Sequence, residues 1–348
     1  MILVALTPGL TADPDLVRHI AETEFRHLGV EGRVVTGLGK TLEETGDAVV
    51  AVGPPVPHPA PVVWYDPADT GPVEVSPGSV HLYGRGLWGL TWAIRHAFHR
   101  LRHPAERIAY GPGDEQWGEL RLPPRHDGGP PPVAVLIHGG YWRSIWAADL
   151  MDALAVDLAG RGYAAWNLEY RRPDRHGWQA TVADVEAGLD RLTGLDALDL
   201  GRVVVLGHSA GGQLALRAAA DDRARVAVAV SLAGVLDLTE GERRRVGTGA
   251  VAHALGGPSA EIPGVYAAAD PLSRLPLGVR QVVAVGADDD LDLLDFSRRY
   301  AAKAHAAGDD VTLVERPGGH FAVIDPASEI WAATMDEVDR AIGLTRAG

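Results

Sequence analysis

The segment Gly207-His208-Ser209-Ala210-Gly211 has the spacing G-x-S-x-G, with glycines two residues before and two after a serine. An apolar run, Arg202–Leu206, precedes it and a run of small residues, Ala210–Ala220, follows it, so we expect a strand, a tight turn and a helix. Only glycine fits beside so tight a turn. The turn would raise Ser209 Oγ above the sheet, where the helix N-terminus favours developing negative charge. The pattern indicates a nucleophilic serine, with a simple helix-capping serine as the alternative.

A serine hydroxyl attacks only when a base takes its proton, and in this arrangement an acid and then a histidine follow the serine along the chain. His320, in Gly318-Gly319-His320-Phe321, follows the last apolar run and precedes the last helical pattern. We therefore favour His320 as the base. Four other histidines are expected on helices or remote loops at the surface, namely His126, His176, His253 and His305.

Four carboxylates that could orient the base follow the apolar run Gln281–Val285, namely Asp288, Asp289, Asp290 and Asp292. We favour Asp289, which stands three residues beyond Gly286. Side chains alternate in an extended segment, so Asp288 and Asp290 would point away from the side that Asp289 faces. Asp292 suits the N-terminus of the next helix. Spacing alone leaves these neighbours open.

A second glycine motif, His138-Gly139-Gly140-Tyr141-Trp142, follows the apolar run Val133–Ile137. Glycines there would let backbone N–H groups approach a tetrahedral oxyanion, with the N–H of Ala210 as the partner donor. A plain turn is the alternative. The aromatic residues that could wall a pocket beside this oxyanion hole, or else pack in the core, are Tyr141, Trp142, Trp146 and Trp178.

The chain from about Pro130 onward alternates short apolar runs with longer amphipathic stretches, which predicts a mostly parallel, doubly wound α/β sheet. The expected strands are Val133–Ile137, Tyr163–Leu168, Arg202–Leu206, Val226–Leu232, Gln281–Val285 and Val311–Glu315. The expected helices are Trp146–Ala159, Gln179–Leu192, Ala210–Ala220, Leu294–Ala307 and Ser328–Ile342. Residues 237–275 would form a cap insertion, in which Arg243-Arg244-Arg245 is either a solvated run or a contact for a substrate carboxylate.

Residues 1–103 predict a separate, small α/β domain, and residues 104–348 the larger one, because Pro104 ends a helical pattern. Strands are expected at Ile2–Leu6, Ala48–Val52, Val62–Tyr65 and Val80–Tyr83, and helices at Pro14–Leu28 and Leu87–Leu101. The segment Ile108–Pro124 resembles an edge hairpin that opens the larger domain.

Two further patterns in the small domain invite a cofactor or metal, and we interpret both as structural. Gly84-Arg-Gly86-Leu-Trp-Gly89 fits G-x-G-x-x-G, but it comes late in the unit and lacks a suitably placed acidic residue, so close strand–helix packing is favoured over a dinucleotide site. His96, His99 and His103 share a helix face without a carboxylate at ligand spacing, and arginines surround them. We expect a solvated basic surface there, with no metal and no cofactor.

Composition excludes several classes of function. The 348 residues carry 32 Lys and Arg against 46 Asp and Glu, a formal net charge of −14, which disfavours nucleic acid as a partner. The absence of cysteine excludes disulfides and thiolate catalysis. No apolar run approaches the roughly 18 residues of a membrane span, and Met1–Leu6 reads as a short buried strand rather than a signal peptide. We expect a cytoplasmic protein that does not bind membranes.

The region from Ile108 to Ile342 resembles the α/β-hydrolase superfamily of esterases and amidases. The HGGYW and GHSAGG strings and Gly319-His320-Phe321 are most similar to the kynurenine formamidase (arylformamidase) branch. The resemblance implies Ser209 as nucleophile, Asp289 as acid and His320 as base, with an oxyanion hole at Gly139, Gly140 and Ala210. The chain departs from that branch in two ways: the acid loop lacks the Val-Pro that often follows the aspartate, and the N-terminal unit is additional.

The sequence therefore predicts a cofactor-independent serine hydrolase that cleaves a small ester or amide through an acyl-enzyme, most like an arylformamidase. A carboxylesterase or exopeptidase of the same fold is the enzymatic alternative. A non-catalytic binding or assembly protein is the alternative from another class, and the presence of both Ser209 and His320 argues against it. The expected partner is a small molecule, and a homo-oligomer stays open.

Overall fold

The computed structural model describes residues 1–37, 48–68, 70–124, 129–222 and 224–344. The chain divides into two compact units, Met1–Ala105 and Glu106–Gly348. Within the described residues, each unit has its own sheet, of five strands in the first and eight in the second.

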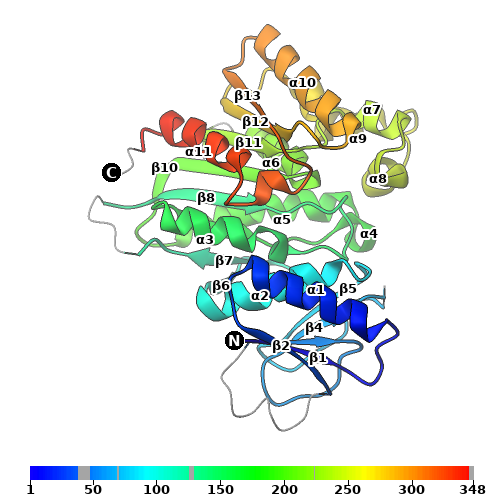
Figure 1. Cartoon of the computed structure of the whole chain (residues 1–348). Coiled ribbons are helices and arrows are strands. Elements are labelled where there is room, and N and C mark those ends of the chain that lie inside the picture. Colours follow the sequence, from blue (N-terminus) through cyan, green and yellow to red (C-terminus); the bar gives the residue numbers. More distant parts are fainter. Residues whose placement is uncertain (38–47, 69, 125–128, 223, 345–348) are drawn as a thin grey trace. The chain divides into compact units, whose positions relative to one another are not determined.

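The first unit is a parallel sheet with strand order β2-β1-β3-β4-β5 (Figure 1). Its strands are β1 (Ile2–Leu6), β2 (Gly32–Thr36), β3 (Ala48–Val52), β4 (Val63–Asp66) and β5 (Val80–Tyr83). Its helices are α1 (Pro14–His27) and α2 (Gly89–Arg102). Strand β2 was not expected from the sequence. It lies at the sheet edge and is half-exposed, so it lacks the continuous apolar run that is typical of a strand buried on both faces.

The Gly84–Gly89 segment packs helix α2 closely onto the sheet. Gly84 and Gly86 have φ values of 73° and 58°, which favour glycine. The Tyr65 hydroxyl donates a hydrogen bond to the Gly86 carbonyl. A Cβ on Gly89 would lie 2.3 Å from Tyr65 Oη. Positive φ therefore accounts for Gly84 and Gly86, and close strand–helix packing accounts for Gly89.

The expectation of a solvated histidine face on α2 is wrong for two of its three members. His96 and His99 are 5% and 7% exposed, whereas His103 is exposed. Tertiary packing explains the difference, because the neighbouring residues Ile94 and Ala97 belong to the buried stripe of the same helix. No group of three His, Asp or Glu side chains in the described ranges is arranged to hold a metal ion.

The second unit is a mixed sheet with strand order β13-β12-β11-β10-β8-β9-β7-β6. Its strands are β6 (Glu106–Ala109), β7 (Trp117–Arg121), β8 (Pro132–Ile137), β9 (Ala164–Leu168), β10 (Asp199–His208), β11 (Val228–Leu232), β12 (Arg280–Gly286) and β13 (Val311–Arg316). Strand β7 runs antiparallel to β6 and β9, and the other neighbours are parallel. The carboxyl ends of β8, β10, β12 and β13 consequently meet at one edge, where this kind of sheet binds ligands.

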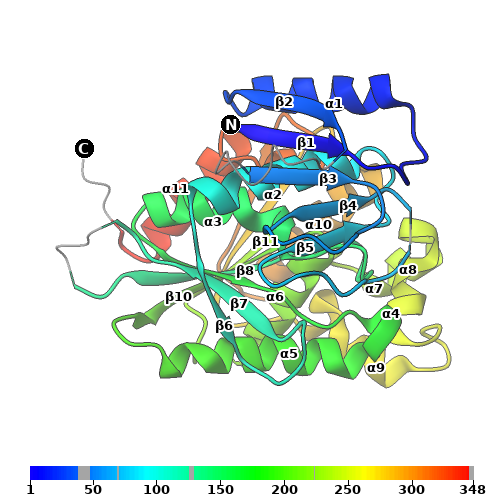
Figure 2. The same ribbon diagram turned by 90° about the horizontal axis from the view of Figure 1, so that it is seen from below.

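Helices cover both faces of this sheet, with α3 and α11 on one side and α5 and α6 on the other (Figure 2). The helices are α3 (Asp152–Gly160), α4 (Pro173–His176), α5 (Trp178–Asp190), α6 (Ala210–Asp221), α7 (Leu238–Arg243), α8 (Val246–Leu255), α9 (Pro263–Ala269), α10 (Leu291–Ala306) and α11 (Glu329–Ala341). The 3-10 turns are η2 (Ala148–Met151), η3 (Arg191–Gly194), η4 (Pro271–Arg274) and η5 (Ala322–Ile324). This arrangement is the α/β-hydrolase fold expected from the sequence.

Two local features refine the expected elements. The helix expected from Trp146 begins later, with η2 at Ala148. Trp146 lies in a turn, in which its N–H donates to the Arg143 carbonyl. Helices α7, α8 and α9 and the turn η4 lie between β11 and β12, within the segment 237–275 expected as an insertion, which we call the cap. No helix in the described part of the chain combines the length and hydropathy that a bilayer crossing requires.

The packing of α2 generates a stability prediction. Gly89→Ala should destabilise the protein by about 1 to 3 kcal/mol, because overpacking forces neighbouring atoms to move, and the new Cβ would lie 2.3 Å from Tyr65 Oη and 2.4 Å from Arg85 Cβ. Urea unfolding measures this change. Gly160→Ala is the control, since no heavy atom lies within 4 Å of its Cβ position. Equal midpoints for the two variants would contradict the close-packing explanation.

Candidate active site

Ser209 sits between β10 and α6 in a strained backbone conformation, with φ 54° and ψ −118°. Such a conformation costs about 1 to 3 kcal/mol in a non-glycine residue and is typical of functional sites. A Cβ on Gly207 would lie 1.9 Å from the Gly211 carbonyl oxygen, and one on Gly211 would lie 2.1 Å from the Ile137 carbonyl oxygen. The strand, turn and helix expected around Ser209 are all present, and both flanking glycines are sterically required.

His320 and Asp289 lie within hydrogen-bonding distance of each other. The Nδ1 atom of His320 is 3.1 Å from each carboxylate oxygen of Asp289. The Asp289 side chain is fully buried, while that of His320 is 24% exposed. Because a carboxylate only accepts, Nδ1 carries the hydrogen and Nε2 is left to exchange a proton. The pair has the geometry of a base oriented by an acid.

Backbone contacts hold the acid loop and the base loop together. The Asp288 N–H donates to the Gly318 carbonyl over 3.0 Å, and the Gly318 N–H donates to Asp288 Oδ2 over 3.0 Å. A Cβ on Gly286 would lie 2.0 Å from the Gly318 carbonyl oxygen. These two loops follow the neighbouring strands β12 and β13, so the sheet itself brings Asp289 to His320.

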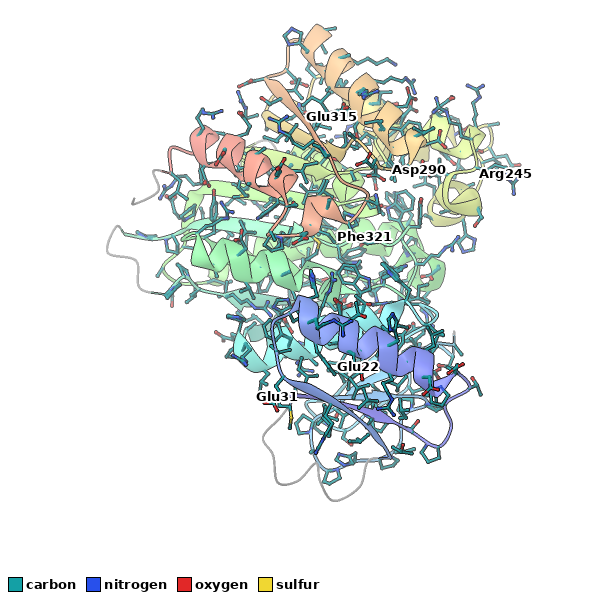
Figure 3. All side chains as sticks on the ribbon, viewed as in Figure 1. Glu22, Glu31, Arg245, Asp290, Glu315 and Phe321 are labelled. Atoms are coloured by element: carbon teal, nitrogen blue, oxygen red, sulfur yellow. The ribbon has the colours of Figure 1, made fainter. Side chains whose placement is uncertain are left out.

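The other aspartates of this loop have different partners. Asp288 accepts from Gly318, and Asp290 caps α10 by accepting the Asp292 N–H over 2.9 Å. Asp292 pairs with Arg244 over 2.8 Å. Figure 3 shows Asp290 at the start of α10 and Phe321 at η5, on the two segments that carry Asp289 and His320.

His208 is a residue of this site that sequence reasoning missed. Its Nε2–H donates to the His320 carbonyl over 3.1 Å, and the two imidazole centroids are 4.7 Å apart. Burial first, and then the nearby His320, lower the pKa of His208 well below its usual value, so the ring stays neutral. The x position of G-x-S-x-G accepts many residues, so the motif alone did not mark His208. It connects the serine turn directly to the base loop.

The loop after β8 lies against the serine turn. A Cβ on Gly139 would be 2.6 Å from the His208 carbonyl oxygen and 2.9 Å from Ser209 Cβ. Gly140 has a φ of 113°, and its Cβ position lies 2.3 Å from Trp146 Cβ. No acceptor among the described residues receives the N–H of Gly139 or Gly140. Ala210 is the first residue of α6, and its N–H has no intrahelical acceptor. These donors could stabilise an oxyanion beside Ser209.

The aromatic residues of this region divide into two groups. Trp142 and Trp178 are 2% and 7% exposed, belong to the hydrophobic core and contact each other edge to face. The Trp142 Nε1–H donates to Gln213 Oε1 over 3.1 Å. Both side chains therefore pack in the core, which is the alternative role that the sequence left open. Trp146 and Tyr141 are half-buried: Trp146 packs on Gly140, and Tyr141 lies against Gly247 of the cap.

The arginine run of the cap is mostly neutralised within the protein. Arg243 pairs with Glu240, and Arg244 pairs with Glu240, Asp292 and Asp295 at 2.8 to 2.9 Å. These contacts favour the structural reading of the run. Among the histidines expected at the surface, His176, His253 and His305 are exposed, and His126 lies outside the described residues.

Sequence comparisons find partial matches to known hydrolases. The family model BD-FAE matches residues 119–276. The chain is 33% identical over 153 residues to Hydrolase LUC6 from a Fusarium species. That match covers 40% of this chain, and the chain spans 35% of the length of this curated relative.

Structural comparison finds esterases with the same fold. Esterase B from Lactobacillus Rhamnosis superposes with a TM-score of 0.61 and 19% identity, covering 74% of this chain and 92% of that chain. A bacterial heroin esterase superposes with a TM-score of 0.56 and 24% identity, covering 70% and 84%. An esterase from Thermogutta terrifontis superposes with a TM-score of 0.55 and 22% identity, covering 69% and 93%. The likeness establishes the α/β-hydrolase fold.

The geometry of the acid loop predicts which carboxylate orients the base. Asp289→Asn should lower kcat by up to about 10⁴-fold, because the amide would no longer stabilise the imidazolium formed during turnover. Asp288→Asn and Asp290→Asn are matched controls and should each cost far less, since their carboxylates accept from backbone N–H groups instead. Steady-state kinetics on a chromogenic ester measures all three variants. Near-normal kcat in Asp289→Asn, with a large loss in either control, would show that the acid is misassigned.

Proposed function

We propose that the second unit is a serine hydrolase that cleaves short-acyl carboxylic esters through an acyl-enzyme. The observation that carries this proposal is the strained Ser209 turn, which stands beside the unpaired backbone donors of Gly139 and Gly140 and is linked through His208 to the Asp289–His320 pair. Nucleophile, base, orienting acid and oxyanion donors are the four parts that acyl transfer requires.

In the proposed reaction, His320 Nε2 takes the proton of the Ser209 hydroxyl as Oγ attacks the ester carbonyl carbon. The oxyanion that forms accepts hydrogen bonds from the backbone N–H groups at Gly139, Gly140 and Ala210. His320 then gives its proton to the leaving alcohol, which leaves an acyl-serine. Water repeats the sequence with His320 as base and releases the acid.

One observation favours a short acyl group, and another favours an ester bond. Trp146 fills the space next to Gly140, and Tyr141 lies against Gly247, so side chains crowd the oxyanion loop on both sides. The structural neighbours bear the names of esterases, which favours ester over amide as the scissile bond. A long acyl chain would need space that these aromatic side chains occupy.

Arylformamidase activity is the second candidate. The HGGYW and GHSAGG strings support it, as does the crowding of the loop, because formyl is the smallest acyl group. An N-formyl arylamine such as N-formylkynurenine would place a formyl group on Ser209 and release an aromatic amine. The two candidates share one mechanism and differ in the leaving group.

Active-site labelling tests the nucleophile. A fluorophosphonate should label the protein at Ser209, because the reagent mimics the tetrahedral intermediate. Ser209→Ala should abolish both labelling and ester turnover. Ser231→Ala is the control, since Ser231 is another buried serine at the carboxyl end of the neighbouring strand β11. Labelling that survives in Ser209→Ala would refute the assignment.

Substrate comparison tests the acyl group and the leaving group. We expect kcat/KM to be highest for p-nitrophenyl acetate or propionate and to fall as the acyl chain lengthens, because Trp146 and Tyr141 restrict the space near Gly140. N-formylkynurenine is assayed in parallel with the ester series. A higher kcat/KM for N-formylkynurenine than for acetate would favour the formamidase candidate, and a preference for long acyl chains by orders of magnitude would contradict both.

A further inference from the structure

We propose that Glu169 and Tyr170 position the oxyanion loop, and that His138, held between them, is a buried imidazolium cation. The proposal rests on the function proposed above, because it assigns a role to side chains behind the Gly139 and Gly140 donors. Glu169 and Tyr170 directly follow strand β9, next to the β8 strand that carries the loop. Neither residue belongs to a motif that marked the site in the sequence.

Two hydrogen bonds behind the oxyanion loop set the direction of the two donor N–H groups. In a trans peptide the carbonyl of one residue and the N–H of the next point in opposite directions. The Tyr170 hydroxyl donates to the His138 carbonyl over 2.8 Å, and this contact fixes the peptide plane that contains the Gly139 N–H. His138 Nδ1 lies 2.8 Å from the Gly139 carbonyl oxygen, and this contact fixes the plane that contains the Gly140 N–H. Each donor N–H is thus oriented by a hydrogen bond to the carbonyl oxygen of its own peptide unit.

Both ring nitrogens of His138 face hydrogen-bond acceptors. A carbonyl oxygen only accepts, so the Nδ1 atom facing the Gly139 carbonyl carries a hydrogen. The Nε2 atom lies 3.2 Å from Glu169 Oε1. Glu169 also accepts the N–H groups of Ala148 and Tyr170, at 3.0 Å and 2.9 Å, and the guanidinium of Arg172. A carboxylate with that many donors is ionised and can only accept, so Nε2 carries a hydrogen as well.

The buried groups around His138 can hold a positive charge on its ring. The side chains of His138, Glu169 and Arg172 are 0%, 3% and 4% exposed, so each buried charge needs a partner. Glu169 faces both cations, and Arg172 also pairs with Glu115. Two positive and two negative groups therefore balance. Glu115 lies 3.0 Å from the partly exposed His176 as well.

Tyr170 and His208 fit the same charge state. The Tyr170 ring stacks on the imidazole with centroids 4.4 Å apart, an arrangement that suits a cation. Burial raises the pKa of Tyr170, so its hydroxyl stays a donor. His208 is neutral for the reasons given above and adds no opposing charge. A fixed positive charge next to the two donors would strengthen their interaction with an oxyanion.

The charge state has a direct test that does not depend on activity. The full-length protein, with ¹⁵N-labelled histidine, is examined by ¹H–¹⁵N correlation NMR at pH 8, and His138→Gln identifies the signals of His138. We expect protons on both ring nitrogens of His138, at a pH where an ordinary histidine is neutral. A ring with one protonated nitrogen would overturn the assignment of a cation.

Kinetics tests the positioning role. Tyr170→Phe removes only the hydroxyl that fixes the His138 carbonyl, and Glu169→Gln keeps an acceptor but removes the charge. For p-nitrophenyl acetate we expect each variant to lower kcat about 10- to 100-fold with KM changed less than about twofold, since misdirected donors affect the transition state selectively. The affinity of a boronic acid, which forms a tetrahedral adduct with the serine, should fall by a similar factor.

Tyr300→Phe is the matched control, because Tyr300 is an equally buried tyrosine whose hydroxyl donates to Gln281, away from the loop. It should keep kcat even if the protein becomes less stable. Unchanged kcat in Tyr170→Phe, or equal losses in Tyr170→Phe and Tyr300→Phe, would overturn the positioning role. If the wild-type protein neither hydrolyses the ester nor reacts at Ser209, the proposed function fails, and with it the positioning role, while the NMR experiment still decides the charge of His138.

Discussion

Close backbone packing at the carboxyl edge of the second sheet is the constraint on which the candidate site depends. Three glycines face carbonyl oxygens at distances that no side chain would tolerate: Gly211 faces Ile137, Gly139 faces His208, and Gly286 faces Gly318. Each contact joins segments that follow different strands. Because the glycines allow this approach, the proposed nucleophile Ser209, the proposed oxyanion donors and the Asp289–His320 pair gather at one edge of the sheet.

The same constraint accounts for much of the backbone strain. Seven non-glycine residues in the described part of the chain have positive φ, and four of them, Tyr141, Trp142, Ser209 and Ala233, follow strands β8, β10 and β11 at this edge. Strain of this kind persists only where the surroundings determine the conformation. This conformation is fixed here by the buried strands, the Trp142–Gln213 hydrogen bond and the His208–His320 contact. The surrounding fold thus stabilises a backbone conformation at Ser209 that an isolated peptide would not keep.

The sequence was informative where the determinants are local. The serine turn depends on glycines within two residues of Ser209, and the buried strands on short apolar runs, so both could be predicted. The edge strand β2 has half-exposed residues, and the histidines of α2 are buried by tertiary packing that their helical spacing does not reveal. Glu169 and His208 act through contacts 31 and 112 residues away in the chain. No local pattern encodes partners at such separations.

The acid loop illustrates how tertiary contacts resolve a choice that composition leaves open. Four aspartates within five positions repel one another unless each charge meets a separate partner. Asp288 meets the Gly318 N–H, Asp290 meets the N-terminus of α10, and Asp292 meets Arg244 of the cap. Arg244 also pairs with Asp295, and Arg299 of α10 pairs with Asp237, so two guanidinium groups connect the cap segment to α10. Asp289 alone is directed to the base, and its three neighbours are occupied by contacts that fix the loop in the register this orientation requires.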